Sequence, residues 1–246
     1  MREPRFALHN APSSVPRSTT GNDGEKTAHR LLAACKSVRK RDLRSADRQF
    51  SAFLKSIGHS VPKHEPAEHR NAVRQALSSS IEDPRGRLVS AMSLAVRIDL
   101  QVEAETTAAR SATGAEWGNK QQTLQNRAIE MYTDVAEAAA ATSKPQSEWA
   151  QHIELAALDR SGAYSWAMHQ LGPAIRAQRR MIHLLNRSDD PHKLLSTTEQ
   201  SEVHTQLGIL LITRGSVTNS KADHTEAVRE LGKAREISPV DPHPRA

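Results

Sequence analysis

Cysteine and aromatic side chains are scarce in this chain, and each shortage excludes something. Cys35 is the only cysteine among 246 residues, so an internal disulfide and a multi-cysteine zinc site are excluded. Phe, Trp and Tyr make up 3% of the sequence, and β-branched residues form no runs, although strands favour both kinds. The composition therefore predicts an all-α protein, and the lone cysteine indicates a reducing, cytoplasmic setting.

Long apolar runs and catalytic motifs are missing as well. No apolar stretch approaches the roughly 20 residues that span a bilayer, and the start of the chain lacks the apolar core of a secretory signal. The sequence holds no glycine-rich phosphate loop, no Gly-x-Ser-x-Gly turn and no pair of carboxylates in an apolar context. We therefore expect a protein without membrane contact, cofactor, bound metal or enzymatic activity.

What the chain does contain is a helical period, because apolar residues recur at three- and four-residue steps. Gly58 is typical of a helix end, and Asp83–Pro84 of a helix start. Thr197-x-x-Gln200 and Asp223-x-x-Glu226 are similar to capping boxes. The expected helices cover residues 26–38, 43–57, 67–79, 83–109, 119–142, 147–161 and 163–171, with breaks at 114–118 and Gly162 and a restart at Gly172–Pro173.

The two ends of the chain lack this period. Prolines and serines punctuate residues 1–23, so we expect a disordered N-terminal segment. A helical repeat-like domain over residues 24–239 follows, and residues 240–246, with two further prolines, are expected to be a frayed tail.

Between Glu202 and Pro239 small and large side chains follow a demanding spacing. Small residues let two helices approach closely, large ones fill the gap between them, and a proline prevents continuation. The residues in this pattern are Leu207, Gly208, Leu211 and Gly215, then Ala227, Leu231, Ala234 and Pro239. The segment resembles a tetratricopeptide repeat, a helix–turn–helix unit that stacks with its neighbours.

The match departs from the family's pattern at several positions. His204, Leu211 and Leu231 stand where Trp, Tyr and Phe are usual, and about seven extra residues within 216–223 separate the two expected helices. An ordinary helical hairpin is the alternative interpretation. A second, weaker match to the repeat pattern consists of Gly162, Ala167, Leu171 and Ala174. Pro173 contradicts this match, because proline breaks a helix interior.

The resemblance implies an architecture and a class of function. It implies stacked antiparallel helix pairs in a right-handed superhelix, whose groove binds a protein or peptide as an adaptor or regulatory module. The groove residues expected from the inner helices are Trp166, His169, Arg176, Gln206, Leu210 and Arg214. Trp149, Trp166, Tyr132 and Tyr164 could also line a groove, although aromatic residues at helical spacing more often belong to the core.

Positive charge is concentrated in one segment. The chain carries a net charge of +6, and residues 26–48 alone hold eight basic side chains against two acidic ones. The candidate basic patch consists of Lys36, Lys40, Arg41, Arg44 and Arg48. On a continuous helix several of these would form a stripe that binds phosphates, which makes a nucleic-acid-associated protein the second hypothesis. A solvated face with a basic turn between two helices is the other interpretation, and no aromatic side chain interleaves the patch.

The histidines and the cysteine give weaker signals. His64 and His69 are five residues apart, not the four that place two ligands on one helical face, so a zinc-protease site is not expected. His204 lies on the expected inner helix, where it packs or lines the groove. Cys35 lies on an apolar helix face, where a thiol is normally a small buried hydrophobic group.

Overall fold

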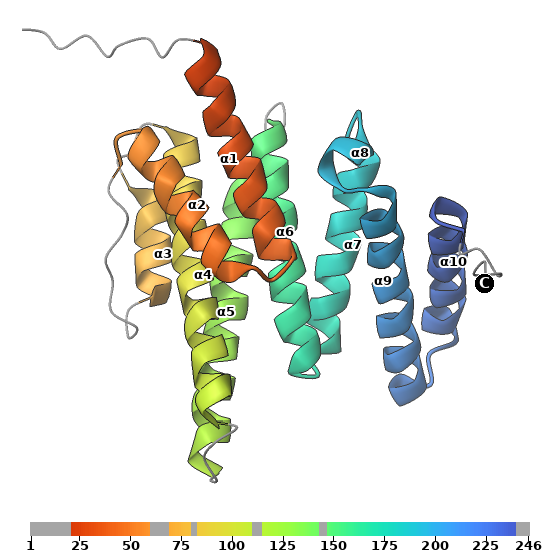
Figure 1. Ribbon diagram of the computed structural model, residues 1–246. Helices are drawn as coiled ribbons and strands as arrows, with labels where there is room; N and C mark the ends of the chain where they lie inside the picture. Colours follow the sequence, from red (N-terminus) through yellow and green to blue (C-terminus); the bar gives the residue numbers. More distant parts are fainter. Residues whose placement is uncertain (1–20, 60–68, 80–82, 110–114, 143–146, 240–246) are drawn as a thin grey trace, which may run out of the picture.

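The computed structural model describes residues 21–59, 69–79, 83–109, 115–142 and 147–239. Within these ranges the chain forms ten helices and no strand, which confirms the all-α prediction (Figure 1). The segments 1–20 and 240–246, to which most of the expected disorder was assigned, lie outside the described residues. None of the helices in the described ranges is both long enough and apolar enough to cross a bilayer.

The helices pack against their neighbours in chain order and form a row that runs from α3 to α10 in Figure 1. The short α2 and the long α1 lie across this row, with α2 against α4 and α1 against α6. The bounds are α1 Gly21–Arg39, α2 Leu43–Ser56, α3 His69–Ser78, α4 Pro84–Ala109, α5 Ala115–Ala141, α6 Glu148–Ala167, α7 Leu171–Arg187, α8 Pro191–Leu194, α9 Thr197–Thr218 and α10 Lys221–Ile237.

The first hairpin, α1 with α2, follows directly from local sequence. Asp42 caps α2 by accepting a hydrogen bond from the Ser45 backbone N–H at 3.2 Å, and Gly58 follows that helix with φ +78°, a left-handed conformation that glycine adopts without strain. Cys35 and Phe50 are both fully buried. The predicted helices 26–38 and 43–57 are therefore confirmed as a hairpin.

Helix α4 contacts α2, α3, α5 and α6. It begins at the predicted Asp83–Pro84 pair, where Asp83 Oδ1 accepts a hydrogen bond from the Arg85 backbone N–H at 2.9 Å. Because it is covered from several sides, most of its residues from 88 to 99 are buried, polar Ser93 and Asp99 included. A buried charge needs internal partners, and Asp99 has them in Tyr132, Arg160 and Tyr164, whereas Ser93 Oγ has no partner among the described residues.

Two glycines predicted to interrupt helices lie inside them instead. Gly118 belongs to α5, which begins at Ala115, and Gly162 to α6, so the expected break at 162 is wrong and the one expected at 114–118 does not extend to Gly118. A helical glycine lowers stability by only about 1 kcal/mol relative to alanine, which surrounding packing outweighs. At Gly162 the missing side chain has a use, because a Cβ there would lie 3.2 Å from the Ala177 Cβ on α7.

The continuous α6 also overturns the second, weaker repeat match. Ala167 ends α6, and Leu171 begins α7, so these residues do not share the second helix of a repeat. The expected helix 163–171 is likewise absent. Pro173 stands in the first turn of α7, whose N-cap is Gln170, where a proline removes no hydrogen bond. The close pairing in this region is that of Gly162 with Ala177.

The connection into α9 differs from the sequence prediction by one residue. A short helix, α8, occupies part of the expected loop at 189–191. The capping box is formed by Ser196 and Glu199 rather than by Thr197 and Gln200: the Ser196 backbone N–H donates to Glu199 Oε2 at 2.8 Å, and Ser196 Oγ accepts from the Glu199 backbone N–H. Thr197 is the first helical residue, so it cannot serve as the cap.

The extra residues expected between the last two helices do not form a loop. Helix α9 continues to Thr218, Asn219 ends it with φ 53°, and Ser220 caps α10. The insertion therefore lengthens both helices. Asp223 is not a cap, because its carboxylate accepts two hydrogen bonds from Arg214 at 2.6 and 2.7 Å.

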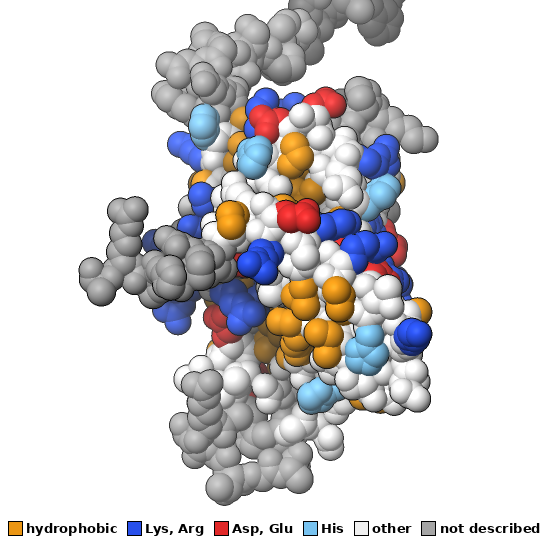
Figure 2. Space-filling model, turned by 90° about the vertical axis from the view of Figure 1, so that its right-hand side faces the viewer, with side chains coloured by type: hydrophobic (Ala, Val, Ile, Leu, Met, Phe, Trp, Pro, Cys, Tyr) orange, Lys and Arg blue, Asp and Glu red, His pale blue; other side chains and the backbone are white. Residues whose placement is uncertain are grey.

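The packing predicted for the last two helices is confirmed. A Cβ on Gly208 would lie 2.7 Å from the Leu231 Cγ and 3.4 Å from the Ala227 carbonyl oxygen, so the glycine lets α10 lie directly on α9. Beyond this pair the row ends. Figure 2 looks at that end and shows hydrophobic side chains gathered on it, and Val228 of α10 is 72% exposed.

Gly208→Ala is expected to lower the free energy of unfolding by about 1–2 kcal/mol, since overpacking outweighs the gain in helix propensity. Gly232→Ala is the matched control, because a Cβ there meets nothing within 4 Å, and we expect it to gain about 0.5–1 kcal/mol. Urea unfolding measures both. The loss in Gly208→Ala should shrink when Leu231 is also replaced by alanine; equal losses in both backgrounds would contradict the close contact.

Candidate functional site

A cleft of about 460 Å³ brings residues of the two predicted site groups together. It is lined by the end of α1, by α6 and α7, and by the first turns of α9. Lys36 and Lys40 of the basic patch lie on one side, and Gln206 of the expected groove lies on α9. We call it the Arg39 cleft, after one of the residues that line it.

Arg39 ends α1 and is poorly satisfied for a buried cation. Its side chain is 10% exposed, and its Nη2 lies 3.2 Å from Glu199 Oε1 on α9. In the described part of the chain, its Nε and Nη1 are buried and have no hydrogen-bond partner. A buried donor left unpaired costs about 1–3 kcal/mol, so this guanidinium is suited to an oxygen acceptor that enters the cleft.

The surroundings of Arg39 shift the pKa values of two neighbouring carboxyl groups. Burial opposes ionisation of Glu199, but hydrogen bonds from Ser196 and the charge of Arg39 lower the pKa of its carboxyl. Burial raises the pKa of Asp159, against the opposing charges of Arg160 and Arg39. The cleft therefore contains both signs of charge.

His152 lies close to this site, on α6. It is 6% exposed, and its Nε2 is buried without a hydrogen-bond partner among the described residues. Burial, and then the charge of Arg39, lower the pKa of His152 to about 4. The imidazole is consequently neutral at pH 7, so it adds no charge to the cleft.

The remaining basic residues do not continue the stripe. Helix α1 ends at Arg39 and α2 begins at Leu43, with Arg41 in between at φ 60°. The continuous helix that would align Lys36, Lys40, Arg44 and Arg48 is therefore absent, because the chain reverses direction at this turn. Arg44 and Arg48 are exposed on α2, as expected for a solvated face with a basic turn.

The expected groove residues are spread over the structure. Trp166, 37% exposed, and His169 lie at the end of α6 and just beyond it, and His169 lines a separate hollow of about 350 Å³ beside α5. Arg176 is exposed on α7. Leu210 is fully buried and packs in the core instead of facing a ligand.

Arg214, the sixth expected groove residue, is already engaged. Its hydrogen bonds to Asp223 raise the pKa of the Arg214 guanidinium, and in return lower that of the Asp223 carboxyl. This bidentate pair fastens α9 to α10. Of the six residues, only Gln206 lines the Arg39 cleft.

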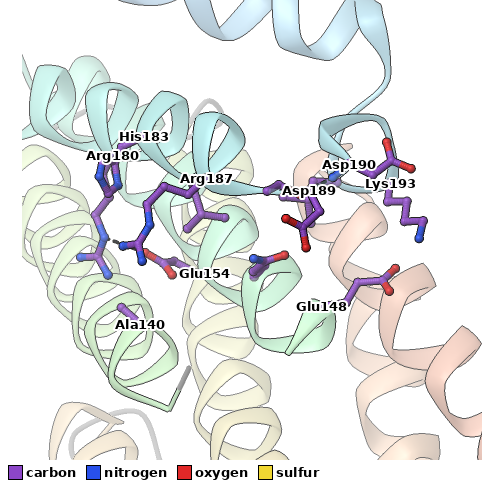
Figure 3. A pocket seen from close by; sticks show the side chains of 13 residues that line it. Ala140, Glu148, Glu154, Arg180, His183, Arg187, Asp189, Asp190 and Lys193 are labelled. Carbon is purple, nitrogen blue, oxygen red and sulfur yellow. Dashed lines mark hydrogen bonds and ion pairs between the residues drawn. The ribbon is translucent and has the colours of Figure 1, made fainter. Parts of the chain in front are cut away.

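A larger hollow, of about 840 Å³, is lined by the ends of α5 and α7, the first turns of α6, and α8 (Figure 3). We call it the Glu154 pocket. Glu154 of α6 is almost completely buried, and its Oε1 accepts a hydrogen bond from Arg180 Nε at 2.7 Å. Arg180 Nη2 donates to the Ala136 carbonyl oxygen at 2.8 Å. Glu154 Oε2 is buried and has no hydrogen-bond partner among the described residues.

The residues that matter in both hollows were not singled out from sequence. Arg39 was one of eight basic residues in its segment, with nothing to mark its burial. The Glu154 pocket does have a signal, because Glu148, Gln151 and Glu154 repeat at three-residue steps along α6. Polar residues at that spacing lie on one helical face.

A third polar group is structural. Asp99 of α4 is fully buried and accepts hydrogen bonds from Arg160 at 2.7 and 2.8 Å, from Tyr132 at 2.9 Å and from Tyr164. Burial and the Asp99 charge raise the pKa of both tyrosines well above the ordinary value. Tyr132 and Tyr164 thus belong to the core, and this network ties α4, α5 and α6 together.

In the described ranges the candidate metal ligands do not cluster, and the thiol of Cys35 is buried. No group of three or more His, Cys, Asp or Glu side chains there could hold a metal ion, and most of the segment from His64 to His69 lies outside them. Cys35 is fully buried, and burial raises the pKa of its thiol to about 12. The thiol is therefore protonated at neutral pH, as expected for a small buried hydrophobic group.

Comparison with known proteins adds no family. No protein-family model matches the sequence, and no curated protein matches it. The class that the fold and site define is an all-α chain of paired helices with two hollows of mixed charge.

Proposed function

We propose that this chain is a non-enzymatic, cytoplasmic binding module of the tetratricopeptide-repeat kind, an adaptor or regulator that holds an acidic peptide segment of a partner protein in the Arg39 cleft. The observation that carries the proposal is Arg39, which lines the cleft and whose Nε and Nη1 are buried without a hydrogen-bond partner among the described residues. Cys35 as a single buried thiol supports the reducing location.

The packing of the helices supports the repeat interpretation. Gly208 lies against Leu231 in the last pair, and Gly162 lies against Ala177 in the pair before it. In both pairs a small residue on the first helix lets the second approach closely. Units of this kind bury their apolar faces only by stacking, and a superhelix of stacked pairs leaves one face free for a ligand.

A peptide carboxylate fits the chemistry of the cleft. Arginine binds carboxylates through charge-assisted hydrogen bonds, and the first turn of α9, which lines the cleft, presents the positive end of a helix dipole. Lys36 and Lys40 would attract an acidic segment toward it. Met181 and Val203 offer apolar contacts to the rest of a peptide.

A nucleic-acid backbone fits the same cleft less well. Asp159, Glu199 and Glu202 line it, and their charges would repel successive phosphates, whereas a peptide has to place only one carboxylate beside Arg39. The basic residues also lie on two helices separated by a turn, so they do not follow one track. Phosphate binding is therefore kept as an outcome of the test.

The proposal is tested by selecting peptides from a random display library with the whole chain. We expect acidic sequences to be enriched, and Arg39→Gln to weaken the binding of a selected peptide at least tenfold, which corresponds to about 1.4 kcal/mol. Arg235→Gln, an exposed change on α10, is the matched control and should leave affinity unchanged. Circular dichroism confirms that both variants are folded.

Two results would contradict this function. The first is enrichment of peptides without regard to acidic residues, with Arg39→Gln binding them as well as the unaltered chain does. The second is binding of single-stranded oligonucleotides with an affinity that falls steeply with salt and is lost in Lys36→Ala with Lys40→Ala, which would favour the nucleic-acid hypothesis.

A further inference from the structure

The Glu154 pocket has the properties of a built site for a small ligand. Its volume of about 840 Å³ falls within the roughly 300–1,000 Å³ of small-molecule pockets. Glu154 is 97% buried, because only 3% of its side chain is exposed, yet its Oε2 has no hydrogen-bond partner in the described part of the chain. A buried carboxylate oxygen without a donor is an acceptor for an N–H group.

Charges of opposite sign are separated along the pocket. Figure 3 shows Arg180, His183 and Arg187 of α7 together at one end, beside Glu154, and toward the other end the carboxylates of Glu148, Asp189 and Asp190 together with Lys193. Arg180 is held by Glu154 and by the Ala136 carbonyl oxygen, whereas the Arg187 side chain is exposed. The pocket is therefore dipolar, because Arg180 and Arg187 outnumber Glu154 at one end, and Glu148, Asp189 and Asp190 outnumber Lys193 at the other.

We propose that the Glu154 pocket binds a short peptide with free termini. The peptide carboxylate lies at Arg187, a backbone N–H donates to Glu154 Oε2, and the terminal ammonium lies between Asp189 and Glu148. A simple anion or cation fits less well, since each would meet like charge at one end of the pocket. This site is separate from the Arg39 cleft and does not depend on the function proposed for it.

The residues that line the pocket agree with this orientation. Arginine engages a carboxylate through two parallel N–H groups, and an ammonium has three donors for surrounding carboxylates. Leu184 and Leu194 line the pocket as well, so small apolar side chains of a peptide have a contact surface. Asp190 is otherwise occupied, because its Oδ1 accepts a hydrogen bond from the His192 backbone N–H and caps α8.

Isothermal titration calorimetry of the full chain with trialanine tests the proposal. N-acetyl-trialanine lacks the ammonium, and trialanine amide lacks the carboxylate, so each is expected to bind at least tenfold more weakly than trialanine. In Arg187→Gln, trialanine and its amide should bind equally weakly, because the partner of the carboxylate is gone. In Asp189→Asn with Glu148→Gln, trialanine and its acetylated form should likewise bind equally weakly.

Arg235→Gln is the control here as well, since Arg235 is exposed on α10 and does not line the pocket. It should keep the tenfold preference for trialanine. Failure of all three peptides to bind the folded chain would overturn the proposal, and so would equal affinity for the three. Loss of acidic-peptide binding in Arg39→Gln does not test the Glu154 pocket, so the two proposals can fail independently of each other.

Discussion

Asp99→Asn is expected to lower the free energy of unfolding by about 3–5 kcal/mol, the largest effect we expect from any single polar change. The Asp99 side chain is completely buried and balances the charge of Arg160, whose own side chain is 6% exposed. Asparagine has nearly the same shape but carries no charge, so Arg160 would remain buried without a counterion. Breaking one half of a buried ion pair in this way typically costs 3–5 kcal/mol.

Urea unfolding followed by circular dichroism measures this effect. Asp47→Asn is the matched control, because Asp47 pairs with Arg97 at 2.9 Å while both side chains are more than a quarter exposed. An exposed pair of this kind contributes about 0–1 kcal/mol. A loss of less than about 1 kcal/mol in Asp99→Asn would show that the network is hydrated rather than closed.

Acidification from pH 7 to pH 4 is expected to remove on the order of 3 kcal/mol of stability through His152 alone. Burial, and then the charge of Arg39, lower the pKa of His152 from 6.5 to about 4. The unfolded chain therefore takes up a proton near pH 6.5, whereas the folded chain does so only near pH 4. Because the unfolded state binds more protons throughout this window, stability falls as the pH falls, by about 1.4 kcal/mol per pKa unit.

The pH dependence of urea unfolding in His152→Gln isolates this contribution. The variant should lose less stability than the unaltered chain between pH 6.5 and pH 4, since it has no imidazole to titrate. His183→Gln changes an exposed histidine and should keep the original pH dependence. Parallel curves for His152→Gln and the unaltered chain would mean that His152 titrates at its ordinary pKa in the folded state.

Sequence patterns predicted the local structure well where a few neighbouring residues decide it. The α1–α2 hairpin, the start of α4 at Asp83–Pro84 and the burial of Cys35 all follow from caps and from the helical period. These interactions join residues three or four positions apart, so they can be predicted from the sequence itself.

Two predictions were wrong where tertiary packing decides the extent of a helix. Gly162 was expected to end a helix, yet α6 continues through it because α7 packs against the gap that its missing side chain leaves. The seven residues expected as a loop before α10 instead extend two helices that stabilise one another. A propensity of about 1 kcal/mol per residue is easily exceeded by such contacts.

What the sequence by itself determined is the class of fold: helices of defined length and period, an apolar face on each, and a last pair with small residues placed for close approach. What only the tertiary structure decided is the chemistry of the hollows. Arg39 and Glu199 meet although 160 residues separate them in the chain, and Glu154 lies buried beside Arg180 of the next helix. Whether a side chain is buried, and whether its donors and acceptors are paired, depends on how distant segments pack. A local sequence pattern does not contain that information.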